Sequence, residues 1–234
     1  MRRLVRGFWG PREEPAEELA GRWNGTLEQL TRLLPEAGLP GMWRVVRASG
    51  PPSLVPADGA SLLDALSVAR AADDWSEGTG IALRLVAAGA PGWEVEVSGL
   101  AGGRSEFLLQ SLVIVIRTPA AAELPGSELL AAVAECWEPD FGDVTDDDVL
   151  DALEDEAGYG VGEPSVGWFG YLSPARGSLL PEDLAAPCKE MRGGGVLLDI
   201  APQGDTDTVV QTYVRLREAG ALQPLPRPMD RATL

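Results

Sequence analysis

Apolar residues recur along this chain with two different periods. Near the start the spacings are four, four, three and four, which places the residues on one face of an amphipathic helix. A proline stands in the first turn of that helix, a position that tolerates it. We therefore predict a helix from Pro15 to Leu34. The residues that repeat are Leu19, Trp23, Leu27, Leu30 and Leu34.

Other segments alternate with the period of two that is typical of strands. From Trp93 to Val97, one side carries tryptophan and valines and the other carries two glutamates. Residues 112–116 are apolar throughout, which predicts a central strand covered on both sides. Strands are also predicted over 4–9, 81–86, 166–172 and 196–200, and residues 42–46 form a second short apolar segment. Helices are predicted over 127–135, 145–158, 207–219 and from Ser61 onward.

These elements indicate one α+β domain over residues 1–222, with a mixed or mainly antiparallel sheet flanked by helices. Residues 223–234 form a proline-rich C-terminal tail that we expect to be loosely attached. The start of the chain lacks the apolar core of a signal peptide, and no apolar run reaches the length of a membrane span. We expect the protein to act in the cytoplasm.

The charge of the chain is concentrated in one stretch. Between Thr118 and Ala175 the sequence has fourteen Asp and Glu residues and no Lys, Arg or His, out of a net charge of −17. So local an excess predicts a surface of negative potential, which attracts a basic protein and repels nucleic acid and anionic lipid. The alternative is an acidic face that is only solvated.

The most acidic part of this stretch has the boundaries of a helix. Thr145 is a suitable N-cap, with Asp148 three residues later as in a capping box. Val144 and Val149 stand at the positions of a hydrophobic staple. Gly158 ends the helix.

One face of this helix is the first candidate for partner binding. Acids near its C-terminal end oppose the helix dipole, and acids four residues apart repel each other. Acids that reduce the stability of their own helix are expected where they serve to recognise a partner. The residues of this face are Asp147, Asp148, Asp151, Glu154 and Asp155.

Four further residues of the acidic stretch are candidates for the same surface. Trp137 and Trp168 belong to aromatic and glycine-rich segments, and each is suited either to an interface or to a core. Asp140 and Asp143 lie between them and the acidic helix. We include all four in the predicted surface.

Catalytic chemistry is restricted by composition. Without histidine there is no Ser-His-Asp triad and no HExxH zinc site, and neither a GxGxxG nor a GxxxxGK[ST] phosphate loop is present. Cys136 and Cys188 read as reduced thiols. The acids from Asp143 to Asp148 are oxygen ligands suited to calcium, but no register has the glycine and glutamate of an EF-hand. We predict no metal, no cofactor and no enzymatic activity; a carboxylate-based or metal-dependent hydrolase is the third alternative.

The order of several short motifs resembles the immunity protein 52 family of bacterial polymorphic toxin systems. The resemblance spans about residues 3–220 and includes Ala20, Arg22 and Leu30 of the first helix. The motifs that carry it are Phe8-Trp9-Gly10-Pro11-Arg12-Glu13, Trp137-Glu138-Pro139-Asp140, Val166-Gly167-Trp168-Phe169-Gly170-Tyr171-Leu172-Ser173 and Gly193-Gly194-Gly195-Val196-Leu197.

The resemblance implies inhibition rather than catalysis. Proteins of this family bind and neutralise a cognate toxin, and the resemblance implies toxins that are nucleases of the restriction-endonuclease fold. A nuclease is basic where it holds phosphates, so an acidic face would complement it. The alternative is a general acidic interaction module with another basic partner.

Overall fold

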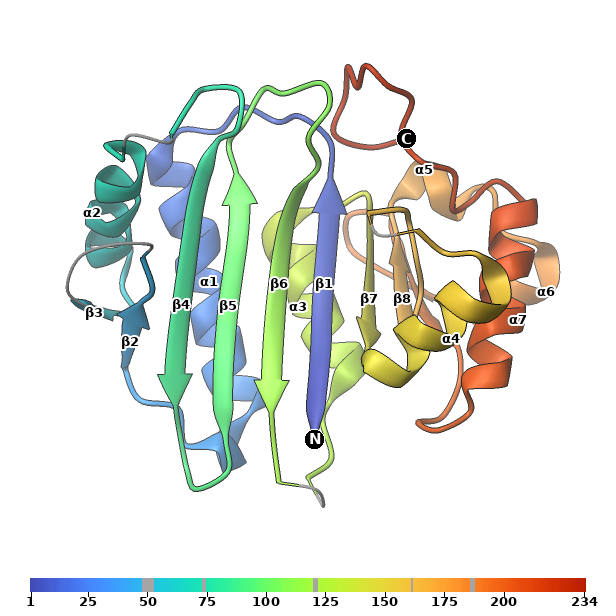
Figure 1. Cartoon of the computed structure of the whole chain (residues 1–234), viewed down its shortest axis with the longest axis horizontal. Helices are drawn as coiled ribbons and strands as arrows, with labels where there is room; N and C mark the ends of the chain where they lie inside the picture. Colours follow the sequence, from blue (N-terminus) through green and yellow to red (C-terminus); the bar gives the residue numbers. More distant parts are fainter. Residues whose placement is uncertain (48–52, 73–74, 120–121, 161, 186–187) are drawn as a thin grey trace.

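The computed structural model describes residues 1–47, 53–72, 75–119, 122–160, 162–185 and 188–234. Its centre is a ten-stranded sheet in the order β3-β2-β4-β5-β6-β1-β7-β8-β10-β9 (Figure 1). Every neighbouring pair of these strands is antiparallel. The first strand of the chain thus lies in the middle, between the β4-β5-β6 meander and the C-terminal strands.

The strands follow the predicted segments closely in the first half of the chain and less closely in the second. They are β1 Arg2–Trp9, β2 Met42–Val45, β3 Ser53–Pro56, β4 Ile81–Ala88, β5 Glu94–Ala101, β6 Gln110–Arg117, β7 Phe141–Thr145, β8 Phe169–Leu172, β9 Lys189–Glu190 and β10 Val196–Asp199.

The helices include all five that were predicted and two short ones that were not. They are α1 Ala16–Leu33, α2 Gly59–Arg70, α3 Gly126–Trp137, α4 Asp147–Ala157, α5 Pro174–Gly177, α6 Glu182–Ala185 and α7 Thr206–Glu218, with a 3₁₀ turn at Pro35–Ala37.

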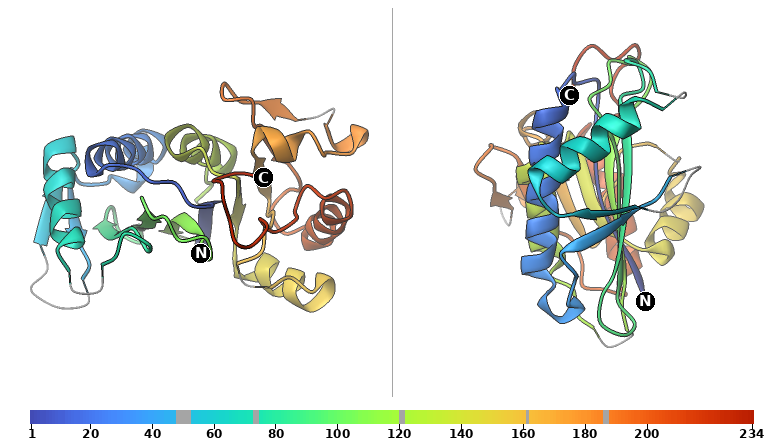
Figure 2. Two further views of the ribbon diagram at one scale, coloured as in Figure 1. Left: turned by 90° about the horizontal axis from the view of Figure 1, so that it is seen from above. Right: turned by 90° about the vertical axis from the view of Figure 1, so that its left-hand side faces the viewer.

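The sheet separates two hydrophobic cores, each with its own helices. The larger core lies between α1, α2, α3 and one face of the sheet, where alternate residues of β4, β5 and β6 are buried. The smaller core lies between α4, α7 and the other side of β7, β8 and β10. Figure 2 shows α1 and α3 on the side of the sheet opposite to α4. The chain is thus a single α+β domain with a mainly antiparallel sheet, as predicted.

The structure differs from the predicted strands: β3, β7 and β9 lie outside the predicted segments, and one predicted strand is shorter. Residues 141–145, for which no strand was predicted, form β7 between β1 and β8. The strand predicted over 166–172 begins only at Phe169, because the Trp168 amide instead donates to the Val144 carbonyl oxygen at 2.8 Å.

The proline-rich tail packs against the domain instead of hanging loosely. Leu225 and Met229 are buried, and the Gly10 amide donates to the Ala232 carbonyl oxygen at 2.8 Å. The Leu234 amide donates to Asp140 Oδ1 at 2.9 Å. In Figure 1 the C-terminus accordingly lies beside α5 at the end of the sheet.

Candidate functional site

The acidic helix α4 begins one residue later than predicted. Asp146, not Thr145, is its N-cap, and its side chain accepts from the Val149 amide at 3.0 Å. Thr145 is the last residue of β7 and is fully buried. The capping box at Asp148 and the predicted hydrophobic staple therefore do not form, whereas Gly158 ends the helix in the left-handed conformation as expected.

The apolar stripe of α4 holds it against the smaller core. Val149, Leu153 and Ala157 are buried there. Arg217 of α7 donates to the Ala157 carbonyl oxygen at 2.7 Å and so supplies a cation at the negative end of the helix. The opposite face of α4 is thereby fixed in position toward solvent.

That outer face carries the acids predicted for it. Arg2 of β1 pairs with Asp147, which ties the start of α4 to the central sheet. Among the described residues no ion pair engages the other acids of the helix. The exposed acids of α4 are Asp147, Asp148, Asp151, Glu154, Asp155 and Glu156.

Three acids of the same stretch point inward and are paired with arginines. Asp140, Asp143 and Asp146 are buried, and their partners are Arg176, Arg6 and Arg3 respectively. A buried carboxylate requires such a partner. These three do not contribute to the surface, so the exposed charge is smaller than the sequence suggested, and Asp140 and Asp143 cannot reach a partner directly.

The Asp143 pair shows how such a carboxylate is held in the interior. Arg6 Nε and Nη2 donate to its two carboxylate oxygens at 2.8 and 2.7 Å, and Ser165 Oγ donates at 2.7 Å. Burial is the largest single effect and lowers the pKa of the Arg6 guanidinium, but the charge and hydrogen bonds of Asp143, together with Tyr159, raise it more, so the pKa is raised overall.

The two candidate tryptophans also lie in the interior. Trp137 is completely buried, stacks on Trp9 and donates from Nε1 to Thr26 Oγ1 at 2.8 Å. Trp168 is buried in the smaller core and donates from Nε1 to Asp146 Oδ2 at 3.1 Å. Both contribute to packing, so of the nine predicted surface residues only the five on α4 are exposed.

A second surface lies beside α4, and little in the sequence indicates it. The side chains of β4, β5, β6 and β1 that point away from α1 and α3 form what we call the open face, since no helix among the described residues covers it between β4 and β6 (Figure 1). Successive rows across it are Val86-Glu96-Val115-Leu4, Arg84-Ser98-Val113-Arg6 and Ala82-Leu100-Ser111-Phe8.

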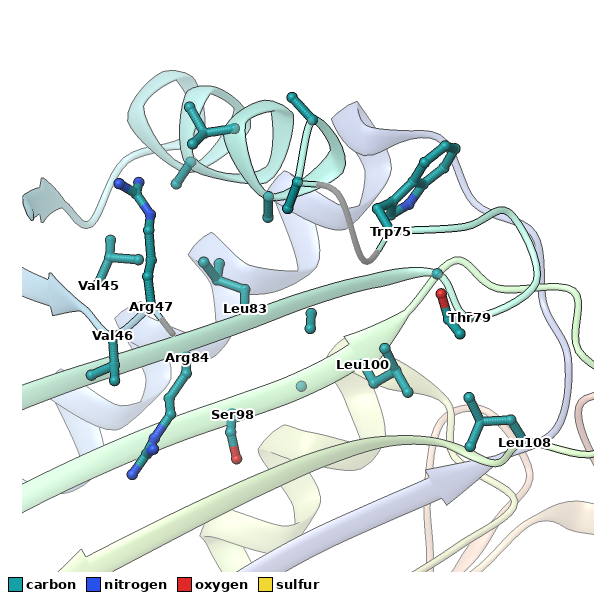
Figure 3. A pocket seen from close by; sticks show the side chains of 18 residues that line it. Val45, Val46, Arg47, Trp75, Thr79, Leu83, Arg84, Ser98, Leu100 and Leu108 are labelled. Carbon is teal, nitrogen blue, oxygen red and sulfur yellow. The ribbon is translucent and has the colours of Figure 1, made fainter. Parts of the chain in front are cut away.

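A hollow of about 900 Å³ lies along β4, and its lining includes residues of α2 and of both faces of β4. Ala82, Leu100 and Leu108 line it on the side of the sheet, and Val68 and Trp75 on the other. Figure 3 shows Leu83 directed toward α2, while Arg84 and Ser98 point away from it. The lining is mainly apolar, without a cluster of catalytic side chains.

The described residues contain neither a cluster suited to a metal ion nor a helix suited to a membrane span. No group of three or more His, Cys, Asp or Glu side chains is arranged among them to hold a metal ion. Within the same residues, no helix is long and apolar enough to cross a membrane.

The chain is a single α+β domain that presents an acidic helix, α4, and the open face of the sheet on its surface. The model of the family Immunity protein 52 matches residues 4–224, and the chain belongs to this family. Among solved structures, it is similar to the Pseudomonas aeruginosa T6SS protein PA0821, with 14% identity, a TM-score of 0.53, and 94% of this chain and 73% of that chain covered. That likeness concerns the fold alone. No curated protein matches the chain.

Proposed function

We propose that this protein binds a cognate bacterial toxin and neutralises it without enzymatic activity, and that it uses the outer face of α4 to do so. Family membership supports toxin immunity as the role. The observation that carries the choice of surface is the set of exposed α4 acids, of which only Asp147 has a cationic partner among the described residues.

The charge of this face specifies a partner with basic groups. Six carboxylates on one helix produce a local negative potential that accelerates the approach of a cationic surface. The toxin that matches best is a nuclease, because an enzyme that holds a phosphate backbone must present Lys or Arg there. The carboxylates of α4 would occupy the positions of phosphates, and the encounter would take place in the cytoplasm.

The arrangement of α4 supports recognition rather than stability as the reason for its acids. Glu154, Asp155 and Glu156 lie at the negative end of the helix dipole, where each costs some tenths of a kcal/mol. Arg217 compensates the end of the helix from α7 but leaves the outer face unneutralised. An acidic helix with its apolar stripe fixed and its charges free is pre-organised for a partner, which reduces the entropic cost of binding.

The test uses a variant of α4 with fewer charges and a matched control. The triple variant Asp151→Asn, Glu154→Gln, Asp155→Asn removes three charges from α4. The control Glu17→Gln, Glu18→Gln, Asp64→Asn removes three exposed charges from α1 and α2, on the other side of the sheet. Binding to the purified product of the gene next to the one encoding this chain is measured at low and high salt.

We expect the α4 variant to associate about tenfold more slowly at low salt and to lose most of the salt dependence, whereas the control behaves like the wild type. Protection of cells that express the toxin should decline in parallel. Equal association rates for the wild type and the α4 variant would contradict the acidic interface. Failure of the wild type to bind or protect would contradict toxin immunity through this partner.

A further inference from the structure

We infer that the open face of the sheet, beside α4, forms the centre of the toxin interface, with α4 as its charged border. This inference rests on the proposed function and adds to it a second surface of different chemistry. Leu4, Val86 and Val115 are buried, yet they belong to neither hydrophobic core. Val113 and Leu100 lie on the same face and are partly exposed.

The composition of β6 is the first argument. An antiparallel sheet with one solvated face alternates apolar and polar residues. In β6, Ile114 and Ile116 face the larger core, but the residues between and before them on the other face are valines, Val113 and Val115. The sequence is that of a strand covered on both sides, whereas no helix of the described residues lies over this side, where Val115 is buried by its neighbours and Val113 is partly exposed (Figure 1). A partner protein that docks on this face would cover Val113.

The open face is also electrically neutral and shallow. Arg84 Nε and Nη2 donate to the two carboxylate oxygens of Glu96 at 2.8 and 2.9 Å, and Arg117 pairs with Glu94. These cross-strand pairs bring no net charge. Toward the other end of the face, small side chains share their rows with Arg84 and Leu100, and the small ones permit close approach of a partner surface. The short side chains are Ala82, Ser98, Ser111 and Val113.

The position of α4 beside this face identifies the occupant by charge complementarity. Arg2 stands in the row next to Leu4 on β1 and contacts Asp147 at the start of α4, so the acidic helix adjoins the open face. Figure 1 shows α4 in front of the strands next to it. A neutral, partly apolar centre with a charged border is the usual anatomy of a protein interface. The occupant is therefore a toxin surface with a small, uncharged centre and basic residues on the side that meets α4.

A second copy of this chain fits the open face less well. Each copy carries a net charge of −17, and two copies would bring two acidic helices into the same contact region. Like charges at an interface disfavour association. Charge therefore favours the basic partner over a homodimer.

The test distinguishes the contribution of the open face from that of α4 by measuring association and dissociation rates separately. Ser98→Tyr places a bulky side chain at the centre of the open face without changing charge, and it suits a strand because tyrosine has high β propensity. Val113→Gln, a second and smaller change, places an amide where the partner would have to desolvate it. Ser178→Tyr at the end of α5 is the matched control, since Ser178 is exposed and outside the open face.

Binding of the adjacent gene's product is measured for each variant at two salt concentrations, and thermal unfolding confirms that each variant is folded. We expect Ser98→Tyr and Val113→Gln to dissociate about tenfold faster or more, with the salt dependence of association retained. Ser178→Tyr should bind like the wild type.

Three outcomes overturn the inference in distinguishable ways. If the wild type binds and both open-face variants bind equally well, the toxin docks elsewhere while the proposed function stands. If the wild type neither binds the toxin nor protects cells from it, the proposed function itself is contradicted. If sedimentation shows a wild-type dimer that Ser98→Tyr converts to monomers, the occupant is a second copy of this chain.

Discussion

Arg6 and Asp143 face each other across β1 and β7 in a two-pronged ion pair with N–O distances of 2.8 and 2.7 Å. Asp143 is fully buried, and Ser165 supplies a further hydrogen bond. The pair joins the first strand of the chain to a strand that lies far from it in the sequence. It therefore contributes to the assembly of the sheet and not to its surface.

Removal of one partner of this pair should be costly, because it leaves an uncompensated charge in the interior. We expect Asp143→Asn to lower the free energy of unfolding by about 3–5 kcal/mol in urea denaturation. The double variant Arg6→Met, Asp143→Leu should recover a large part of this loss, since it leaves no buried charge. A double variant as unstable as the single one would show that the ion pair itself, rather than charge balance, is required.

Asp146 should be far more important for stability than its neighbour Asp148. Asp146 caps α4, pairs with Arg3 and accepts from Trp168, so Asp146→Ala should cost at least about 3 kcal/mol. Asp148 is exposed in the first turn, and Asp148→Ala should cost no more than about 1 kcal/mol. Comparable losses in thermal unfolding would contradict the observed start of the helix.

Gly167 has no room for a side chain. A Cβ atom there would lie 2.1 Å from the Val144 carbonyl oxygen, the same atom that accepts from the Trp168 amide. Gly167→Ala should therefore lower the melting temperature sharply or prevent folding. Gly21 in α1 provides the control because a Cβ atom added there would meet nothing within 4 Å. Gly21→Ala should stabilise the protein by about 0.5–1 kcal/mol.

The alkaline limit of stability should depend on Tyr171. Burial, together with the charges of Glu138 and Asp140, raises the pKa of Tyr171 to about 12 from an ordinary value of 10.0. The folded state holds this proton more tightly than the unfolded state, so the stabilisation is complete below pH 10 and is lost as pH rises from about 10 to about 12.

We therefore expect the free energy of unfolding to fall over that pH range, and to fall less in Tyr171→Phe. Absorbance at wavelengths specific for tyrosinate would follow the titration directly. An unchanged pH slope in Tyr171→Phe would assign the effect to another group.

Local periodicity was sufficient to predict the meander of β4, β5 and β6 and the helices α1 and α7. It failed at β7, because the acid at Asp143 looked like part of a loop or a surface. The residue that makes this strand possible is Arg6, which no local pattern connects with it. The burial of Asp140 was not predicted for the same reason, because its partner Arg176 lies far from it in the sequence.

The candidate surface was predicted in part. The acids of α4 could be assigned to one face because the apolar stripe of the same helix fixes its orientation. Trp137 could not be placed, since an aromatic residue fits a core and an interface equally well. The open face was missed because Val113 and Val115 resemble core residues of a central strand, and only the three-dimensional arrangement shows that no helix of the described chain lies over them (Figure 1).

The charges of α4 should be maintained at some expense of stability. Asp151 and Asp155 are like charges four residues apart, and Glu154 and Asp155 oppose the dipole at the end of the helix. The triple variant Asp151→Asn, Glu154→Gln, Asp155→Asn should thus be as stable as the wild type or more stable by about 0.5–1 kcal/mol at low salt. The difference should shrink in high salt because exposed charges are screened.

Urea denaturation of both proteins at two ionic strengths measures this effect without any toxin. A loss of stability in the triple variant would mean that these acids support the fold, for example through cations outside the helix. A gain, combined with slower toxin association, would separate the two roles. The apolar stripe of α4 would account for its position, and the acidic face for its partner.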